Sequence, residues 1–480
     1  MALESFFAPH SVAVVGASHD AQSVGYGLLS SLVHGCVKPG VPGEGKPYGG
    51  EIYAVNPHGG EILGVKCHAN LADVPAERVD LVIIAVPAKI VPQVMRDAVA
   101  KRAKAAIIIS AGFGEAGEEG KQLQDEVISI AREGGVRVLG PNCLGLIAPH
   151  HNLNASFALS TPPAGNVAFF SQSGAMADSI IDWALRERYT FSAIVSLGNS
   201  ADVDVNDLLL WALEDDKTSA ITIYVEGLKD GRKFMDTLRR VTPHKPVIVL
   251  KGGKSAVGLH AVSSHTGSLA GSYKVFAAAV RQAGGLVVNS IEDLFDVARS
   301  RADCPPLNLT PLNTVSPKDG SAQQTPKGVV IVTNGGGAGV LCTDHLSDFG
   351  VPLATLSPEC IAALDASGKM HPAYSRANPL DIVGDALPDR YAAALNTVLA
   401  QDNVAGAIVI QTLQTMTDPV EDARVLIDAK KQHPDKPIVA VFMGGKYSEE
   451  SINLLRENSI PDYNDPKKAA RAMAALAGLL

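Results

Sequence analysis

Short apolar segments alternate with longer segments of mixed polarity along residues 1–150. The apolar segments are rich in valine, isoleucine and alanine and read SVAVVGAS, EIYAVNP, VDLVIIAVP, AKAAIIISAGF and VRVLGPNCLG. Strands of a parallel sheet are buried on both faces and therefore appear as continuous apolar runs, with helices in the stretches between them. Residues 1–150 are accordingly predicted to form an α/β domain with a doubly wound, Rossmann-like sheet.

The same alternation recurs over residues 151–302 and again over residues 328–480. Both parts open with an apolar strand, a turn of small residues and a helix, as in GNVAFFSQSGAMADSI and GVVIVTNGGGAGVLCTDHL. We therefore expect two further parallel-sheet domains with related folds. Residues 303–327 between them are rich in proline, serine, threonine and glutamine and have little apolar periodicity, which predicts a linker.

Composition excludes several classes of protein. The 480 residues carry a formal net charge of -9 and no lysine- or arginine-rich block that would follow a phosphate backbone, so nucleic acid is not an expected partner. The six cysteines are scattered without a CxxC pair, which argues against a zinc site and a disulfide scaffold, and no metal site is expected in this chain. The amino terminus lacks the features of a signal peptide, and the apolar runs fall well short of the ~20 residues of a membrane helix. We expect a cytoplasmic protein without membrane contact.

The turn after the first predicted strand reads VGASHDAQSVGYG. Gly16 permits a tight turn, and Ser18, Ser23 and Gly25 would offer hydroxyl and backbone donors to a pyrophosphate at a helix N-terminus. The turn is not GxGxxG, and the second strand ends in Asn56 rather than in the acidic residue that binds the ribose of NAD. These differences favour another adenosine-phosphate ligand, with coenzyme A as the candidate, over NAD; a turn without a ligand is the alternative.

Two further turns between a strand and a helix are candidate anion sites. Backbone N–H groups and the helix dipole favour an anion at such a turn, although ordinary N-capping is the commoner explanation of either turn alone. Their occurrence twice in one chain indicates a shared anion. The candidate phosphate-binding residues are Ser171, Gln172, Ser173, Gly174, Asn334, Gly335, Gly336 and Gly337.

The candidate catalytic residues are His265 and Glu226. His265 lies among small residues in SSHTGSLAGS, where a neutral imidazole could attack phosphorus and the loop could move. Glu226 ends a predicted strand, at the edge of the sheet where it could orient the imidazole or accept its proton, and a solvated loop glutamate is the alternative. His260 is a weaker candidate because its neighbours are less uniformly small. Cys143 has no basic partner nearby in sequence, and we interpret it as a buried or turn cysteine.

Taken in order, these motifs resemble the CoA-binding, phosphohistidine-bearing subunit of the NDP-forming acyl-CoA synthetases, the superfamily that includes succinyl-CoA synthetase. The resemblance is closest to the α subunits of the ADP-forming acetyl-CoA synthetases. It covers nearly the whole chain, and it rests on SVAVVGAS, IYAVNP, GPNCLG, FSQSGA, YVEG, SSHTGSLAGS, TNGGGAGV and NPLDIVGDA.

The resemblance implies a Rossmann-like CoA-binding domain followed by two flavodoxin-like, succinyl-CoA synthetase-like domains. His265 falls on the phosphorylated histidine of the family and Glu226 on the glutamate that steadies it, and the helices that start near Ser173 and Gly336 would face the phosphate. The candidate CoA-binding residues are Gly16, Ala17, Ser18, Ser23, Val24, Gly25, Asn56, Pro57, Val86, Pro87, Ser110, Ala111 and Gly112.

The family reaction converts acyl-CoA, phosphate and ADP to the acid, CoA and ATP through an acyl phosphate and a phosphohistidine. We find no segment after the third domain that resembles the ATP-grasp domain of the family. We therefore expect the nucleotide site, with ADP or GDP and Mg²⁺, on a separate ATP-grasp β subunit in an α2β2 assembly, or else that this chain is part of a longer enzyme. The sequence does not determine the acyl group.

Two alternatives remain open at this point. A CoA-transferase would use Glu226 as the acyl-accepting carboxylate and would need neither phosphate nor a β subunit. A non-catalytic CoA-binding regulatory module would keep the fold without the chemistry, although the intact SSHTGSLAGS segment argues against it.

Overall fold

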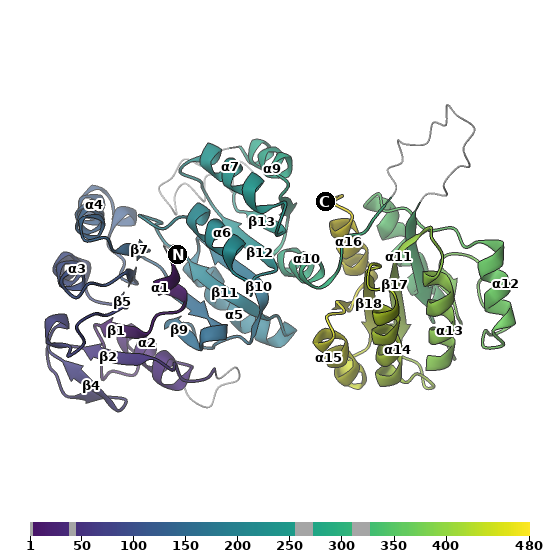
Figure 1. The fold of residues 1–480 in the computed structure, drawn as a ribbon, viewed down its shortest axis with the longest axis horizontal. Helices are drawn as coiled ribbons and strands as arrows, with labels where there is room; N and C mark the ends of the chain where they lie inside the picture. Colours follow the sequence, from purple (N-terminus) through teal and green to yellow (C-terminus); the bar gives the residue numbers. More distant parts are fainter. Residues whose placement is uncertain (1–2, 38–44, 255–271, 310–326) are drawn as a thin grey trace. The chain divides into compact units, whose positions relative to one another are not determined.

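The structure, a computed structural model, describes residues 3–37, 45–254, 272–309 and 327–480. The chain divides into two compact units, Met1–Leu294 and Phe295–Leu480. The first unit contains two sheets and the second contains one (Figure 1). None of the described helices combines the length and the apolar composition needed to cross a membrane. Most of the predicted linker, and both His260 and His265, lie outside the described residues.

The first sheet of the first unit is a twisted parallel sheet with the strand order β3-β4-β2-β1-β5-β6-β7, in which β3 alone pairs antiparallel. Helix α2 and the short α1 share an apolar core with one face, while α3 and α4 share a core with the other. The strands are β1 (Ser11–Val15), β2 (Glu51–Val55), β3 (Glu61–Ile62), β4 (Val65–His68), β5 (Leu81–Ile84), β6 (Ala105–Ile108) and β7 (Arg137–Leu139). The helices are α1 (Glu4–Phe7), α2 (Val24–His34), α3 (Val91–Ala100) and α4 (Glu118–Glu133).

The second sheet has the order β14-β13-β12-β10-β11-β8-β9, with an antiparallel hairpin, β8–β9, on its edge. Strand β8 lies within residues 1–150, so the chain enters the second sheet before residue 151. The strands are β8 (Gly145–Ala148), β9 (Leu153–Ser156), β10 (Ala164–Ser171), β11 (Phe191–Ser196), β12 (Ala220–Val225), β13 (Val247–Lys251) and β14 (Leu286–Val288). The helices are α5 (Gly174–Glu187), α6 (Val205–Glu214), α7 (Gly231–Val241) and α9 (Tyr273–Gln282).

One apolar core continues from the first sheet into the second. It joins buried residues of α2, such as Leu28, to Leu153 of β9 and Phe170 of β10. Phe7 of α1 stacks on Trp211 of α6 with ring centroids 3.5 Å apart. On the surface, Arg137 of β7 forms ion pairs with Asp202 and Asp207 beside α6. The two sheets of this unit are therefore packed as one body, and side chains from both can build one site.

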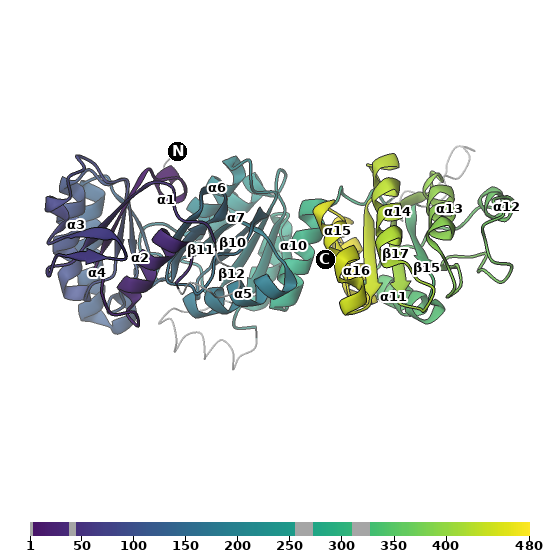
Figure 2. The ribbon, with the colours of Figure 1, turned by 90° about the horizontal axis from the view of Figure 1, so that it is seen from below.

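The second unit holds a parallel sheet with the order β16-β15-β17-β18-β19. Helices α11 and α16 pack on one face, and α12 to α15 pack on the other (Figure 2). The strands are β15 (Gly328–Thr333), β16 (Leu380–Asp381), β17 (Val404–Thr412), β18 (Ile438–Met443) and β19 (Asp462–Tyr463). The helices are α10 (Ile291–Asp303, most of which belongs to this unit), α11 (Gly336–Asp348), α12 (Pro358–Ala366), α13 (Pro388–Leu399), α14 (Pro419–Gln432), α15 (Glu449–Glu457) and α16 (Pro466–Leu476).

The alternation of apolar and polar segments explains these sheets. Central strands such as β1, β5, β11 and β12 are buried at every position, as expected for strands covered by helices on both faces. Local caps begin the helices that follow, for example Ser23 before α2 and Ser173 before α5. The predicted α/β class and its three parallel-sheet regions are confirmed.

Candidate active site

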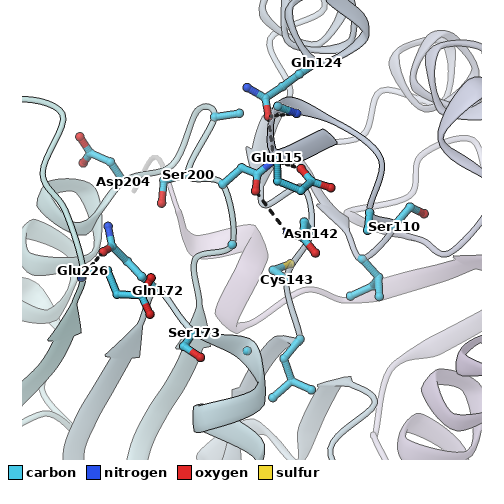
Figure 3. A pocket seen from close by; sticks show the side chains of 18 of the residues that line it. Ser110, Glu115, Gln124, Asn142, Cys143, Gln172, Ser173, Ser200, Asp204 and Glu226 are labelled. Atoms are coloured by element: carbon cyan, nitrogen blue, oxygen red, sulfur yellow. Dashed lines mark hydrogen bonds between the residues drawn. The ribbon is translucent and has the colours of Figure 1, made fainter. Parts of the chain in front are cut away.

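A cavity of about 1440 Å³ lies in the first unit where the carboxyl ends of strands from both sheets meet. Its lining includes the segments that follow β5, β6 and β7 of the first sheet and those that follow β10, β11 and β12 of the second. Figure 3 shows Ser110 on the first-sheet side and Gln172, Ser173 and Glu226 on the second-sheet side. Ligands of open α/β sheets bind at this edge, so the position agrees with a binding site.

The CoA candidates gather at the carboxyl ends of β1, β2, β5 and β6. The N–H of Gly16 donates to Val55 O at 3.0 Å, and Asn56 Nδ2 donates to Ala17 O at 2.6 Å, so the first turn is tied to the end of β2. The hydroxyl of Ser110 donates to Val86 O at 2.5 Å and ties the end of β6 to that of β5. The candidates that line the cavity are Val24, Val86, Pro87, Ser110 and Ala111.

The remaining CoA candidates support the turns. Ser23 caps α2 by accepting a hydrogen bond from the N–H of Tyr26, and Ser18 accepts one from the N–H of Asp20. Gly112 has a φ of +102° and donates its N–H to Glu115. The sequence therefore located the turns correctly, but the CoA candidates that line the cavity come mainly from the ends of β5 and β6 rather than from the first turn. Pro57 is exposed.

Gly25 is required by the close approach of α2 to the first turn. A Cβ at this position would lie 1.9 Å from Gly16 O, which is backbone and cannot move aside. We expect Gly25→Ala to destabilise the protein by about 1–3 kcal/mol and to weaken CoA binding, because α2 must shift away from the turn. Gly27→Ala on the same helix is the matched control, since its Cβ would make only an ordinary contact with Val37 at 3.4 Å. Thermal unfolding and calorimetric titration with CoA would measure both effects, and equal behaviour of the two variants would contradict the prediction.

The turn between β10 and α5 is built by its own side chains. The Ser171 hydroxyl donates to Ser173 O at 2.7 Å and accepts from the N–H of Ser173 at 3.1 Å. The Ser173 hydroxyl accepts from the N–H of Met176, which caps α5. Ser171 is fully buried and does not line the cavity, whereas Gln172, Ser173 and Gly174 do. The positive end of α5 is thereby presented to the cavity, as an anion site requires.

Gln172 holds the end of the neighbouring strand in place. Its Oε1 accepts from the N–H of Glu226 at 2.6 Å and from that of Gly227 at 3.0 Å, and its Nε2 donates to Gly227 O at 2.8 Å. The carboxamide therefore fixes the backbone of Glu226 beside the start of α5. The sequence pattern assigned Gln172 to phosphate binding, whereas the structure places its side-chain bonds on the backbone of Glu226 and Gly227.

Glu226 is 8% exposed and lines the cavity. The hydroxyl of Tyr224 donates to its Oε1 at 3.2 Å, and Lys251 Nζ donates to its backbone O at 2.7 Å. Burial and the negative charge of Glu226 raise the pKa of Tyr224, so the phenol stays protonated and remains a donor. Burial lowers the pKa of Lys251, an effect that the charge of Glu226 opposes. Glu226 is thus held at the cavity wall, its carboxylate by Tyr224 of β12 and its backbone carbonyl by Lys251 of β13.

The turn between β15 and α11 in the second unit repeats this construction. Thr333 takes the place of Ser171, since its hydroxyl accepts from the N–H of Gly335 at 2.9 Å and donates to Gly335 O at 3.0 Å. Asn334 takes the place of Gln172, because its Oδ1 accepts from the N–H of Thr412 at 2.7 Å and its Nδ2 donates to Thr412 O at 2.9 Å. Gly336 and Gly337 then begin α11, and Gly337 is exposed.

The two turns differ at the residue that each carboxamide holds. Ser171 pairs with Tyr224 in the register of β10 and β12, and Thr333 pairs with Ile410 in that of β15 and β17. Two residues further along each strand, Glu226 and Thr412 occupy equivalent positions. The two turns share a backbone design for an anion, but only at the first does the residue held by the carboxamide carry a carboxylate, Glu226. The carboxylate beside the second turn is that of Asp381 in β16, whose Oδ2 would lie 2.6 Å from a Cβ at Gly336.

Cys143 lines the cavity as a buried thiol. Its Sγ donates to Ile108 O at 3.4 Å, and burial raises its pKa to about 12. The thiol therefore remains protonated at neutral pH and is a poor nucleophile, in agreement with its interpretation as a buried turn cysteine.

Several cavity residues were missed by the sequence analysis, namely Glu115, Gln124, Asn142, Asn199 and Lys229. Glu115 follows a strand of the first sheet, and Asn199 follows a strand of the second. The segment LGNS, directly after the apolar strand FSAIVS, was the sequence feature that could have indicated Asn199 as a residue at the ligand edge of its sheet. Because the contact between them depends on how the two sheets pack, residue spacing could not reveal it.

Comparisons with known proteins agree with this geometry. Three family models match: a CoA binding domain over residues 10–149, a succinyl-CoA ligase like flavodoxin domain over residues 164–300, and a ligase-CoA domain over residues 329–477. The chain is 40% identical to the α subunit of ADP-forming acetate–CoA ligase II of Pyrococcus furiosus, with 99% of this chain and 97% of that subunit aligned. It is also 40% identical to ADP-forming acetate–CoA ligase I of Archaeoglobus fulgidus, of which it spans 63%.

A solved structure with a similar fold is acetyl-coenzyme A synthetase 1 of Candidatus Korarchaeum cryptofilum, determined in complex with phosphate and ADP. It has a TM-score of 0.86 and 35% sequence identity, with 100% of this chain and 97% of that chain covered. These findings confirm the fold and the resemblance inferred from the motifs. The chain therefore belongs to the NDP-forming acyl-CoA synthetases, as a ligase of the ADP-forming acetate–CoA ligase α-subunit type.

Proposed function

We propose that this chain is the α subunit that carries out the acyl-CoA half of the reaction in which an acyl-CoA, phosphate and ADP give the acid, CoA and ATP. The observation that carries the proposal is the continuity of one cavity from Val86 and Ser110, among the CoA candidates, to Ser173 and Glu226. A thioester bound at one end would present its carbonyl carbon to a phosphate bound at the other, and such positioning is what the first step requires.

The proposed reaction has three successive steps. A phosphate oxygen attacks the thioester carbonyl, the C–S bond breaks, and CoA leaves as the thiol with the proton that phosphate releases. A ring nitrogen of His265 then attacks phosphorus of the acyl phosphate, the P–O bond to the acyl group breaks, and the acid leaves as its carboxylate. Transfer of the phosphoryl group from His265 to the terminal phosphate of ADP gives ATP and restores the imidazole.

Glu226 would accept a hydrogen bond from the ring N–H of His265 and so direct the other ring nitrogen toward phosphorus. Its buried, clamped backbone and the hydroxyl of Tyr224 support this role. The phosphoryl oxygens would bind at the start of α5, at the turn of Ser171, Gln172, Ser173 and Gly174. The similar turn of Asn334, Gly335, Gly336 and Gly337 is the second phosphate-binding candidate, and its matching hydrogen-bonded construction supports that role.

We place the nucleotide half, with ADP and Mg²⁺, on a separate ATP-grasp β subunit in an α2β2 assembly. The name of the Pyrococcus furiosus relative, an α subunit, supports a partner subunit. The Archaeoglobus fulgidus relative has additional sequence beyond the part that this chain spans, which supports a nucleotide half outside the domains described above.

The test is to incubate the purified chain with radiolabelled phosphate and a panel of acyl-CoAs, with and without a candidate β subunit. We expect an acid-labile, base-stable protein label with a subset of the thioesters, which would also identify the acyl class. CoA transfer between two acids in phosphate-free buffer would indicate a transferase instead. Thermal stabilisation by CoA without label or turnover, even with the β subunit present, would indicate a binding module.

A further inference from the structure

A cluster of polar side chains lines the cavity between its two ends. Asn199, in the loop after β11, donates through Nδ2 to Glu115 Oε2 at 2.5 Å and to Gln124 Oε1 at 3.0 Å. Asn142 Nδ2 approaches Asn199 Oδ1 at 3.4 Å. Figure 3 shows Glu115 and Asn142 between Ser110 and the Glu226 side of the cavity. The four residues connect the two sheets across the cavity wall.

Glu115 connects this cluster to the loop that carries three of the CoA candidates. Its Oε1 accepts from the N–H of Gly112 at 2.6 Å and from that of Phe113 at 3.2 Å. Burial would raise the pKa of Glu115, but the hydrogen bonds from Asn199 and from the backbone outweigh it and hold the pKa below its usual value. The carboxylate is therefore charged at neutral pH, and it ties the loop 110–116 to Asn199.

The backbone of Asn199 is itself held by several contacts. Its N–H donates to Pro141 O at 2.9 Å, and Lys229 Nζ donates to Asn199 O at 3.2 Å and to Ser200 O at 2.7 Å. Gly198 before it has a φ of +54°, and a Cβ there would lie 2.3 Å from Pro141 O. The side chain of Asn199 thus extends from a fixed backbone, and it can in turn fix the first-sheet loop.

We propose that the Asn199–Glu115 contact is a latch that positions the loop 110–116 for CoA binding. The proposal rests on the proposed function, because it assumes that Ser110, Ala111 and Gly112 contact CoA. Asn199 and Glu115 act as positioning residues: when CoA arrives, the loop is already held in its binding conformation, so less ordering is needed on binding.

The ion pairs of Arg137 supply a matched control. They join the same two sheets, with Arg137 Nε 2.8 Å from Asp202 Oδ2, but Arg137, Asp202 and Asp207 do not line the cavity. If the latch only held the sheets together, Asn199→Ala and Arg137→Met would affect the protein alike. If it positions the loop, only Asn199→Ala would change CoA binding.

The experiment measures the CoA dissociation constant of the full chain by calorimetry and the hydrogen exchange of the Gly112 and Phe113 amides. We expect Asn199→Ala to weaken CoA binding about tenfold and to speed exchange at both amides, because a hydrogen bond to a charged group is lost. Arg137→Met should leave both quantities at the wild-type value. Unchanged exchange and unchanged affinity in Asn199→Ala would overturn the latch. Absence of CoA binding by the wild type would refute the proposed function. Hydrogen exchange at Gly112 and Phe113 would still show whether Asn199 holds the loop 110–116.

A charge-bearing substitution adds a pH readout. Asn199→Asp places a second carboxylate against Glu115. Repulsion between two adjacent negative charges raises the pKa of at least one of the two carboxyl groups. Relative to wild type at each pH, its CoA affinity should be weak at pH 8 and should recover as the pH falls, because one carboxyl then takes up a proton and donates. The double variant Glu115→Gln/Asn199→Asp exchanges donor and acceptor and should restore affinity at pH 8. Loss of affinity that is independent of pH and is not restored would contradict the proposal.

Discussion

Replacing His265 by alanine is expected to abolish the protein label and to lower acyl-CoA-dependent ATP formation in the complex with the β subunit by at least about 10³-fold. The imidazole is the proposed covalent carrier of the phosphoryl group, and alanine has no atom that can accept it. Formation of the acyl phosphate does not need the imidazole. We therefore expect phosphate-dependent release of CoA from acyl-CoA to continue in this variant, which separates the loss of the carrier from unfolding.

His260→Ala is the matched control for this prediction, because it removes an imidazole five residues earlier in the same glycine-containing segment. It should retain label and turnover within a few-fold of wild type. Radiolabel on the protein and coupled assay of ATP would measure both variants. Full synthetase activity in His265→Ala would eliminate the phosphohistidine mechanism.

Replacing Glu226 by glutamine is expected to lower kcat of the complete enzyme by about 10²–10³-fold with little change in KM for acyl-CoA. The amide has nearly the size of the carboxylate and keeps an oxygen for the Tyr224 hydroxyl, but it lacks the negative charge that orients and stabilises the imidazole in the proposed mechanism. The Gln172 clamp binds the backbone of residue 226 and is unaffected by the substitution. The CoA candidates lie at the other sheet, which is why KM should be preserved.

Tyr224→Phe is the control for the Glu226 prediction. It removes one hydrogen bond to the carboxylate while the charge stays, so we expect less than about a tenfold decrease in kcat. A loss in Glu226→Gln that appeared equally in phosphate-free CoA transfer between two acids would favour the transferase over the synthetase. Steady-state kinetics with acyl-CoA and phosphate varied separately would distinguish these outcomes.

The repeated turn design explains why two similar helix starts need not have the same role. Gln172 and Asn334 hold neighbouring strands in the same manner, yet they hold Glu226 in one sheet and Thr412 in the other. A threonine hydroxyl cannot hold an imidazole by charge. We therefore propose that Glu226, rather than the equivalent residue Thr412, orients the histidine, and we expect a substitution at Thr412 to affect kcat less than Glu226→Gln does.

The sequence by itself determined the fold class, the two strand–turn–helix segments that are the candidate anion sites, and the first turn near Gly16. These features depend on local properties: apolar runs covered on both faces, small residues at tight turns, and serine or glycine at helix starts. Each is set by residues close together in the chain, so a local pattern is enough to predict it. The family resemblance rested on the order of the same local motifs.

Only the tertiary structure decided which side chains meet. Asn199 and Glu115 are 84 positions apart, and Gln172 and Glu226 are 54 apart, so their contacts depend on strand register and on the packing of one sheet against another. For this reason the sequence could not show that the side chain of Gln172, in the predicted phosphate-binding turn, bonds to the backbone of Glu226 and Gly227. The β8–β9 hairpin likewise joined the second sheet through pairing with β11, which no local pattern specifies. Residues close together in the chain determine the helices and strands, whereas the packing of distant segments determines which side chains contact one another. The cavity wall is built from such long-range contacts, so the local sequence pattern could not predict it.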